Sequence, residues 1–163
     1  VLTAIRPATP ADLAILLPLV RDLHEHEGIR GTLVDVRNAV GRLLAEPQRG
    51  RILVAGDAGL ATGYVAICFG YSIEFHGVDA FVDELYVLPP ERGKGLGQSL
   101  LAAAEALCKA EGVVALHLEV DHANPKAHAL YQRKGFKDHA RHLMTKRLGG
   151  ADTTAKPPSK PLH

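Results

Sequence analysis

The sequence predicts an α/β fold built around a mixed β-sheet. Segments in which apolar residues recur at helical spacing alternate along the chain with short apolar segments that are typical of strands. The turn at residues 56–59 indicates a hairpin and therefore antiparallel strands, whereas the strand–helix–strand order over residues 80–120 predicts a right-handed parallel crossover. The 163 residues have the size of one domain.

The amino-terminal region is expected to form a short strand, at residues 2–6, followed by a helix. Thr9 is a typical N-cap, and Pro10 suits the first helical position because its missing N–H would have no partner there. Leucines and valines then recur at helical spacing until Gly28 ends the helix. Pro18 lies inside this pattern and should kink the helix or start a new turn.

The middle of the chain changes from helix to strand. Thr32 can cap a second helix that ends before Pro47. Apolar segments with turn residues at their ends then predict three strands and, before the last of them, a polar loop. The strands are expected at residues 52–55, 60–69 and 80–88, and the loop at residues 71–79.

The carboxy-terminal part returns to alternating helices and strands. We expect a helix over residues 95–111, a strand over 113–120, a short helix over 125–134 and a last strand within 136–148. Residues 149–163 contain three prolines and a single large apolar side chain, too little to offset the entropy of ordering them. The sequence therefore predicts one domain at residues 1–148 and a Pro/Gly-rich tail at residues 149–163.

Composition argues against several classes of partner. Lys and Arg number 19 and Asp and Glu 18, so the net charge of +1 predicts no general grip on nucleic acid, and 5% aromatic residues leave little for base stacking. No apolar run approaches the roughly 18 residues of a membrane span, and the first residues are too soon interrupted to form a signal peptide. We therefore expect a cytoplasmic protein that binds neither nucleic acid nor membrane.

No metal site is expected either. Cys68 and Cys108 have no C-x-x-C spacing, which argues against structural zinc and against a disulfide framework. The run His-Glu-His-Glu at residues 24–27 lacks the H-E-x-x-H spacing of a zinc protease and is better explained as a solvated helix end.

A glycine-rich loop between a predicted strand and a predicted helix is the most informative segment. Backbone N–H groups at a helix start have no intrahelical partner, and glycines let an anion approach them, so the loop at residues 92–97 predicts a phosphate cradle. The spacing fits neither G-x-x-x-x-G-K-[ST] nor G-x-G-x-x-G, which disfavours a nucleotide-dependent enzyme. It fits R-x-x-G-x-G, with Arg92, Gly95 and Gly97. This pattern resembles the coenzyme A pyrophosphate loop of the GCN5-related N-acetyltransferase (GNAT) family.

A second segment strengthens the resemblance. Asn124, Ala127, Tyr131, Gly135 and Phe136 fit N-x-x-A-x-x-x-Y-x-x-x-G-F, which is similar to the family's second cofactor element. It follows the first motif by about thirty residues, the length of one crossover unit. The resemblance implies a mostly antiparallel central sheet with helices on both faces and a splayed cofactor cleft. It also implies acetyl-CoA as the cofactor and a homodimer, the state in which the family commonly occurs.

The resemblance assigns cofactor roles to both motifs. Backbone groups of the strand would pair with the pantetheine arm, the loop amides would hold the pyrophosphate, and Asn124 would bond the pantetheine region. Tyr131 would protonate the leaving thiolate, whereas Lys126 and Arg133 could reach the 3′-phosphate or remain solvated charges. The implied cofactor-binding residues are Leu85, Tyr86, Val87, Arg92, Gly93, Lys94, Gly95, Leu96, Gly97, Gln98, Asn124, Lys126 and Tyr131.

Asp83 and Glu84 are the candidate bases for deprotonating an amine acceptor. Adjacent residues of a regular strand face opposite sides, so only one would face the cleft unless a bulge intervenes, as it commonly does in the family. The acidic pair resembles that of the diamine and polyamine acetyltransferases, in which the first acid is taken as the base. Here that position is Asp83, one methylene shorter than Glu, which favours proton transfer through a bridging water.

Further acids would favour a cationic acceptor. Glu25, Glu27, Glu74 and Asp79 are the candidate substrate-binding residues. The acceptor itself stays open among small-molecule amines, protein Lys side chains and protein N-termini. A coenzyme A-binding regulatory module without turnover is the remaining alternative to an acetyl-CoA-dependent N-acetyltransferase.

Overall fold

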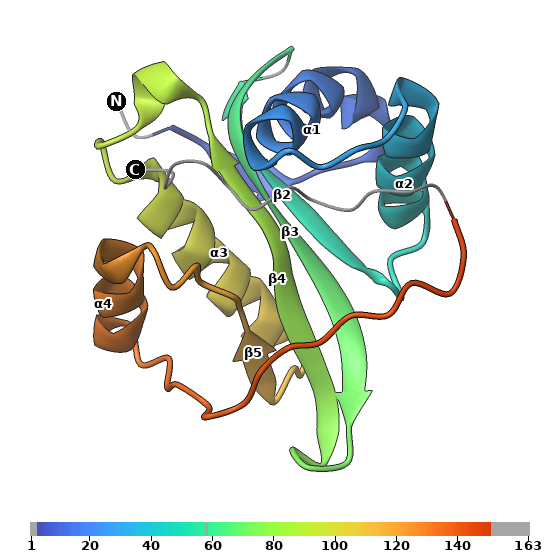
Figure 1. Ribbon diagram of the computed structural model, residues 1–163. Coiled ribbons are helices and arrows are strands. Elements are labelled where there is room, and N and C mark those ends of the chain that lie inside the picture. Colours follow the sequence, from blue (N-terminus) through green and yellow to red (C-terminus); the bar gives the residue numbers. More distant parts are fainter. Residues whose placement is uncertain (1–2, 58, 151–163) are drawn as a thin grey trace.

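The computed structural model describes residues 3–57 and 59–150 and contains one five-stranded sheet in the order β1-β2-β3-β4-β5 (Figure 1). Neighbouring strands are antiparallel except β4 and β5, which are parallel. The predicted mixed α/β fold with a mostly antiparallel sheet is confirmed. The strands are β1 (Ile5–Pro7), β2 (Gly50–Asp57), β3 (Leu60–Ser72), β4 (Gly77–Val87) and β5 (Ala115–His117).

Helices cover both faces of the sheet. Helices α1 and α2 lie on one face, and α3 lies on the other with α4 beside it (Figure 1). The alternation of side chains along a strand divides the core in the same way. On β2, Ile52 and Val54 pack under α1 and α2, whereas Leu53 and Ala55 pack under α3. The helices are α1 (Leu13–Glu27), α2 (Leu33–Ala45), α3 (Leu96–Ala110) and α4 (Pro125–Arg133), with 3₁₀ turns at Pro10–Asp12 and Pro89–Glu91.

The start of α1 follows the predicted capping pattern. Thr9 precedes a 3₁₀ turn with Pro10 at its first position, and the Thr9 N–H donates to the Asp12 carboxylate at 2.7 Å. Arg6 also donates two hydrogen bonds to Asp12, at 2.6 and 2.8 Å, and this contact with Arg6 holds the pKa of Asp12 well below its usual range. Helix α1 runs through Pro18 without a break and ends at Gly28, whose φ of 68° suits glycine.

Two predicted boundaries are wrong. The loop expected at residues 71–79 is mostly strand, because β3 and β4 continue to Ser72 and from Gly77 and leave only a short turn. Alternating apolar and polar residues persist on both sides of that turn, and cross-strand pairing extends the ladder. The strand expected over residues 113–120 is reduced to Ala115–His117.

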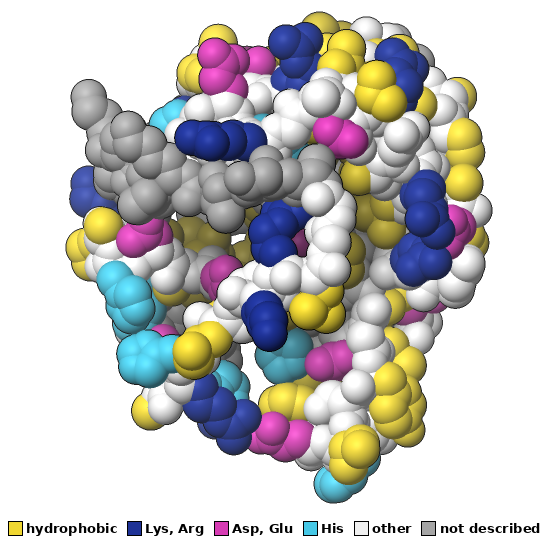
Figure 2. Space-filling model, turned by 45° about the vertical axis from the view of Figure 1, so that its right-hand side comes forward, with side chains coloured by type: hydrophobic (Ala, Val, Ile, Leu, Met, Phe, Trp, Pro, Cys, Tyr) yellow, Lys and Arg dark blue, Asp and Glu magenta, His cyan; other side chains and the backbone are white. Residues whose placement is uncertain are grey.

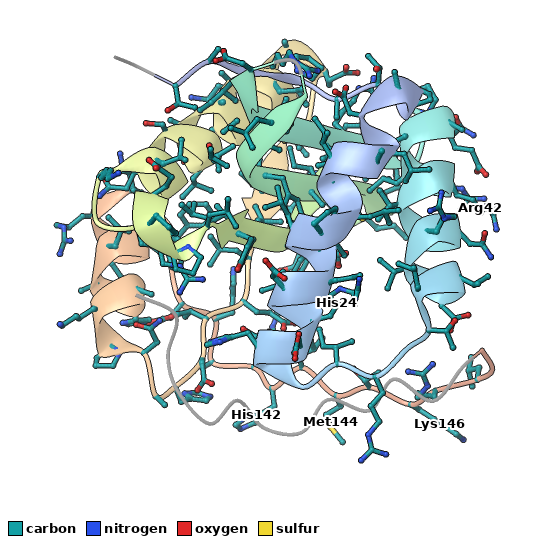
Figure 3. The ribbon with its side chains drawn as sticks, turned by 90° about the horizontal axis from the view of Figure 1, so that it is seen from above. His24, Arg42, His142, Met144 and Lys146 are labelled. Carbon is teal, nitrogen blue, oxygen red and sulfur yellow. The ribbon has the colours of Figure 1, made fainter. Side chains whose placement is uncertain are left out.

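The strand expected within residues 136–148 is also wrong, since this segment contains no strand among its described residues. Beyond Phe136, which packs against the core, the large apolar side chains of the segment stay exposed: Leu143 is 72% exposed and Met144 is 89% exposed. The segment instead runs along the surface, with His142, Met144 and Lys146 on it (Figure 3). Residue 2 of the expected first strand and residues 151–163 of the expected tail lie outside the described residues.

The surface in Figure 2 mixes described side chains of both charges. No helix of the described residues is long and apolar enough to cross a membrane.

Candidate active site

Two hollows lie on either side of β4. The α1–α2 hollow, of about 750 Å³, is bounded by α1, α2 and the strands beneath them, and Asp83 and Glu84 line it. The α3–α4 hollow, of about 370 Å³, lies between the end of β4, the start of α3 and α4, and begins at Leu85. Consecutive residues of β4 therefore line the two hollows, Asp83 and Glu84 the first and Leu85 onward the second.

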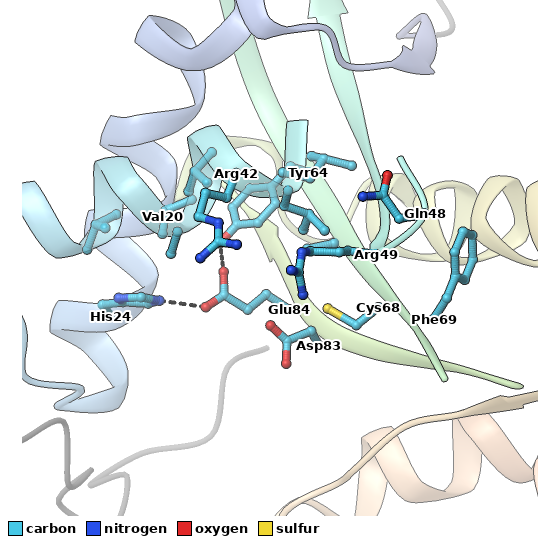
Figure 4. Close-up of a pocket in the computed structure, with 16 residues that line it drawn as sticks. Val20, His24, Arg42, Gln48, Arg49, Tyr64, Cys68, Phe69, Asp83 and Glu84 are labelled. Carbon is cyan, nitrogen blue, oxygen red and sulfur yellow. Dashed lines mark hydrogen bonds and ion pairs between the residues drawn. The ribbon is translucent and has the colours of Figure 1, made fainter. Parts of the chain in front are cut away.

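A β-bulge on β4 sets the direction of the two acids. Ala66 pairs with Glu84 and the next residue of β3, Ile67, pairs with Val82, so Asp83 is the extra residue of β4. A bulge interrupts the regular alternation of side chains, and here it brings Asp83 and Glu84 to the same hollow (Figure 4). The structure thus contains the bulge that the family resemblance implied, and the two acids line one hollow instead of facing opposite sides.

Glu84 is held by hydrogen bonds from two elements. His24 of α1 lies with its Nε2 at 2.5 Å from Glu84 Oε1, and the Tyr64 hydroxyl of β3 donates to Oε2 at 2.6 Å (Figure 4). The contact with Glu84 raises the pKa of His24, which favours the imidazolium as its partner. Burial first, and then the charge of Glu84, raise the pKa of Tyr64, so that its hydroxyl stays protonated.

Asp83 stands beside this network. Its side chain reaches solvent at the floor of the hollow, but the surrounding walls remove part of its hydration. Burial, followed by the nearby charge of Glu84, raises the pKa of Asp83 and makes it a stronger base than an ordinary aspartate. The thiol of Cys68 also lines the hollow, and burial together with the two acids raises its pKa to about 11.

The α3–α4 hollow is suited to an anion. Gly93 and Gly95 adopt φ angles of 75° and 86°, which favour glycine, and no atom lies within 4 Å of the Cβ that either would gain. Helix α3 starts directly after them. The first backbone N–H of this helix that has a hydrogen-bond acceptor is that of Ser99, which donates to the Gly95 carbonyl oxygen at 3.0 Å. The preceding N–H groups, together with the helix dipole, form the cradle that the glycine spacing predicts.

Arg92 connects this cradle to β4. Its Nε donates to the Val87 carbonyl oxygen at 2.9 Å, and its guanidinium lies 5.4 Å from the centre of the Tyr86 ring. Lys94 forms an ion pair with Glu91 at 3.2 Å and does not line the hollow. The side chain of Arg92 thus fixes the loop, while the backbone of the loop faces the space where a ligand would lie.

Helix α4 brings the second predicted motif to the same hollow. Tyr131 and Lys126 line it, whereas Asn124 does not and instead caps α4 by accepting a hydrogen bond from the Ala127 N–H at 3.0 Å. The Tyr131 ring packs edge-on against Phe136 with centroids 5.9 Å apart, and burial raises the pKa of Tyr131. Its hydroxyl therefore carries a proton at neutral pH. Apart from Lys94 and Asn124, all the predicted cofactor residues line this hollow.

Parallel pairing of β4 and β5 ends before Leu85, where this hollow begins. The last pair is Phe81 with His117, after which β4 continues to Val87. In the described part of the chain the edge of β4 beyond Phe81 has no strand partner on that side, so its backbone groups are accessible to an extended ligand. This is the divergence that a splayed cleft requires.

The four acids predicted to bind substrate lie elsewhere. Glu25 and Glu27 are at the carboxyl end of α1, and Glu74 sits in the β3–β4 turn with an ion pair to Arg141 at 3.1 Å. Asp79 is on β4, with a carboxylate oxygen 3.4 Å from the Nε2 of His117 on β5. None of the four lines the α1–α2 hollow.

Sequence reasoning missed three charged residues that do line the α1–α2 hollow: His24, Arg42 and Arg49. Position 24 follows Val20 by one helical turn, on the apolar face of α1, and this spacing was the available signal for His24. Arg42 lies in the last turn of α2, and Arg49 lies beyond its end. The sequence does not indicate that an arginine at either position lines a hollow. Among the described residues, no group of three or more His, Cys, Asp or Glu side chains is placed to hold a metal ion.

Comparisons with known proteins agree with this geometry. The chain is 29% identical over 136 residues to a Bacillus subtilis protein named uncharacterized N-acetyltransferase YhfO, covering 82% of this chain and 89% of that one. It is 32% identical over 139 residues to the L-methionine sulfoximine/L-methionine sulfone acetyltransferase of Pseudomonas paraeruginosa, covering 82% and 80%.

The fold matches solved structures as well. An integron cassette protein from the mobile metagenome of Cole Harbour Salt Marsh superposes with a TM-score of 0.79 at 30% identity, covering 90% of this chain and 91% of that one. Residues 20–136, well over half of the chain, match the family described as Acetyltransferase (GNAT) family. With two hollows that meet at a bulged β4 and a glycine cradle at the start of α3, the chain belongs to the GNAT family of N-acetyltransferases.

Proposed function

We propose that this N-acetyltransferase transfers an acetyl group from acetyl-CoA directly to a small primary amine while both are bound. The observation that carries the proposal is the bulge at Asp83. It directs two carboxylates into the α1–α2 hollow, while the next residues, Leu85 to Val87, border the α3–α4 hollow. An amine in the first hollow and an acetyl group in the second would meet beside β4.

The cofactor would occupy the α3–α4 hollow. Acetyl-CoA supplies an acetyl group that is activated as a thioester. The N–H groups of the glycine cradle and of the first turn of α3 would bind its pyrophosphate, and the unpaired edge of β4 would hydrogen-bond the pantetheine arm. Lys126, which lines the hollow at the start of α4, would add a positive charge on the phosphate side.

Asp83 would remove the proton from the bound ammonium group. A free amine is needed for attack on the thioester carbonyl carbon, and a base with a raised pKa accepts that proton more readily. The short side chain of Asp83 favours transfer through a water molecule. Glu84, with both oxygens already bonded to His24 and Tyr64, would act as a positioning residue whose charge strengthens Asp83.

Tyr131 would supply a proton on the other side of the reaction. As the new C–N bond forms and the C–S bond breaks, the leaving thiolate takes a proton. Tyr131, whose raised pKa keeps its hydroxyl protonated, lines the hollow where that sulfur would lie. The new amide nitrogen would lose its extra proton to solvent, Asp83 would release the proton that it took, and the Tyr131 hydroxyl would recover its proton from solvent before the next turnover.

Direct attack is supported by the state of the only thiol that lines the α1–α2 hollow. A double-displacement route would need Cys68 to attack as a thiolate, but its pKa of about 11 leaves it protonated at neutral pH. A small acceptor is also consistent with the relative from Pseudomonas paraeruginosa, which acts by its name on two amino-acid derivatives.

Thiol release from acetyl-CoA in the presence of an amine panel tests the proposal. We expect release that depends on the amine and a product carrying one acetyl group by mass spectrometry. Coenzyme A binding without turnover on any amine would indicate the regulatory module instead. Turnover only on a peptide Lys or a peptide N-terminus would exclude a small-molecule acceptor.

We also propose a homodimer, the state that the family commonly adopts. Light scattering at micromolar concentration should give twice the mass of one chain, 17.4 kDa. The mass of a single chain would exclude it.

A further inference from the structure

We propose that the acceptor is a primary amine that also carries an anionic group and an apolar side chain, as an apolar α-amino acid does, and that Arg42 and Arg49 bind the anionic group. The inference rests on the proposed function and names its substrate class. It contrasts with the polyamine acceptor that the acidic pair implies.

The two arginines reach the α1–α2 hollow from the end of α2 and the segment after it. The Nε of Arg42 donates to one oxygen of Glu46 at 2.9 Å, and the Nε of Arg49 donates to the other. The Glu46 carboxylate therefore holds both arginine side chains through their Nε atoms. In the described part of the chain no hydrogen bond occupies their terminal nitrogens, and these are the donors that pair with a carboxylate or phosphonate.

Both positively and negatively charged side chains line the hollow. Arg42 and Arg49 with Glu46 carry a net charge of +1 at one place, and Asp83 and Glu84 carry the negative charge at another. Neither arginine forms an ion pair with either acid, although Figure 4 shows all four side chains around the same space. A zwitterion satisfies both groups at once, with its ammonium toward Asp83 and its anionic group toward the arginines.

The remaining walls are apolar. Val40 and Ile52 are 8% and 5% exposed, and they belong to the core under α1 and α2. A hollow of about 750 Å³ with such walls buries an aliphatic or aromatic side chain and gains from removing it from water. The hollow thus offers carboxylates, guanidinium groups and apolar surface, which match the three parts of an apolar amino acid.

A polyamine fits this arrangement poorly. Its second ammonium group would lie in the same hollow as two guanidinium groups, and like charges at short range oppose binding. The acids that were expected to receive that second charge, such as Glu74, lie outside the hollow.

Matched substrates separate the possibilities. We would measure kcat/KM by thiol release for leucine, methionine and phenylalanine, for the amines that lack only their carboxylates, and for putrescine. The variants are Arg42→Gln and Arg49→Gln, with Arg37→Gln as the control, because Arg37 is an exposed arginine of the same helix outside the hollow.

With the wild-type protein, we expect at least one amino acid to exceed its decarboxylated amine by about tenfold or more, the effect of one charge-assisted hydrogen bond. Each hollow variant should lower kcat/KM for that amino acid by about 10- to 100-fold and leave the decarboxylated amine within twofold, while Arg37→Gln changes neither.

Two results would overturn the inference and leave the proposed function intact. One is that putrescine or the decarboxylated amines react as well as the amino acids. The other is that the arginine variants lower kcat/KM equally for an amino acid and for the amine that lacks its carboxylate. The absence of turnover on every amine, with coenzyme A still bound, would overturn the proposed function and the substrate class with it.

Discussion

The two hollows beside β4 differ in whether backbone groups or side chains form their binding surface. The α3–α4 hollow presents mainly backbone: glycines with positive φ, the open N–H groups of α3 and the free edge of β4. The α1–α2 hollow presents side chains from two helices, three strands and the segment after α2, held by hydrogen bonds such as those from His24 and Tyr64 to Glu84. A backbone site suits a cofactor that every member of a family shares, whereas a side-chain site can change with the acceptor.

The largest expected effect tests whether the two hollows cooperate in one reaction. Tyr131→Phe keeps the ring that packs against Phe136 and removes only the proton donor. We expect kcat to fall by about 10²–10⁴-fold while the affinity for coenzyme A stays within twofold, as measured by steady-state kinetics and calorimetry. A wild-type kcat would leave Tyr131 as a packing residue.

Asp83→Asn tests the α1–α2 hollow. The substitution keeps the shape and removes the basic carboxylate, so kcat/KM for the amine should fall by about 100-fold with coenzyme A binding unchanged. Asp57→Asn removes a charge at an exposed strand end and should leave both quantities unchanged. Retention of activity in Asp83→Asn would move the base role to Glu84 or to water.

Gly95→Asp tests the backbone site. It places a carboxylate where the pyrophosphate would bind, and we expect the dissociation constant of coenzyme A to rise by about 10- to 100-fold in calorimetry. Gly112→Asp is a matched control: Gly112 also has a positive φ, of 75° against 86°, and open space around its missing Cβ, but it lies past the other end of α3. Equal losses in the two variants would mean backbone strain rather than charge at the cradle.

The smallest expected effect concerns the contact between His24 and Glu84. Because the pKa of His24 is raised above its ordinary value of about 6.5, its ion pair with Glu84 stabilises the fold fully below that pH and is lost as the pH rises through the folded-state pKa. His24→Gln should therefore lower the free energy of unfolding by about 1–3 kcal/mol at pH 6 and by less at pH 9.

Urea unfolding at both pH values measures this difference. His26→Gln, an exposed position of the same helix, should cost little at either pH. A loss from His24→Gln that is equal at pH 6 and pH 9 would show that the contact is not an ion pair.

The contrast between the hollows also explains what the sequence could predict. The cradle depends on glycines at fixed spacing within one short segment, so Arg92, Gly95 and Gly97 were sufficient to locate it. The arginines at 42 and 49 line the same hollow as Asp83 only because α2 packs against α1 and β2, and such packing leaves no spacing in the sequence. The bulge that turns Asp83 is likewise a property of pairing between strands.

The fold was predictable where local patterns and packing agree. The capped helices and the β2–β3 hairpin follow from periodicity and turn residues. The expected last strand failed because loose alternation over residues 136–148 did not include enough apolar side chains that reach a core, as the exposure of Leu143 and Met144 shows. Strand pairing beyond a neighbouring hairpin is decided by tertiary contacts that periodicity does not encode.

Initial-rate kinetics with both substrates varied tests the central claim most directly, because direct attack requires the amine and acetyl-CoA to occupy their hollows together. We predict double-reciprocal lines that intersect, and unchanged intersecting lines in Cys68→Ser. Parallel lines, with a covalently acetylated protein detected by mass spectrometry before the amine is added, would contradict the account.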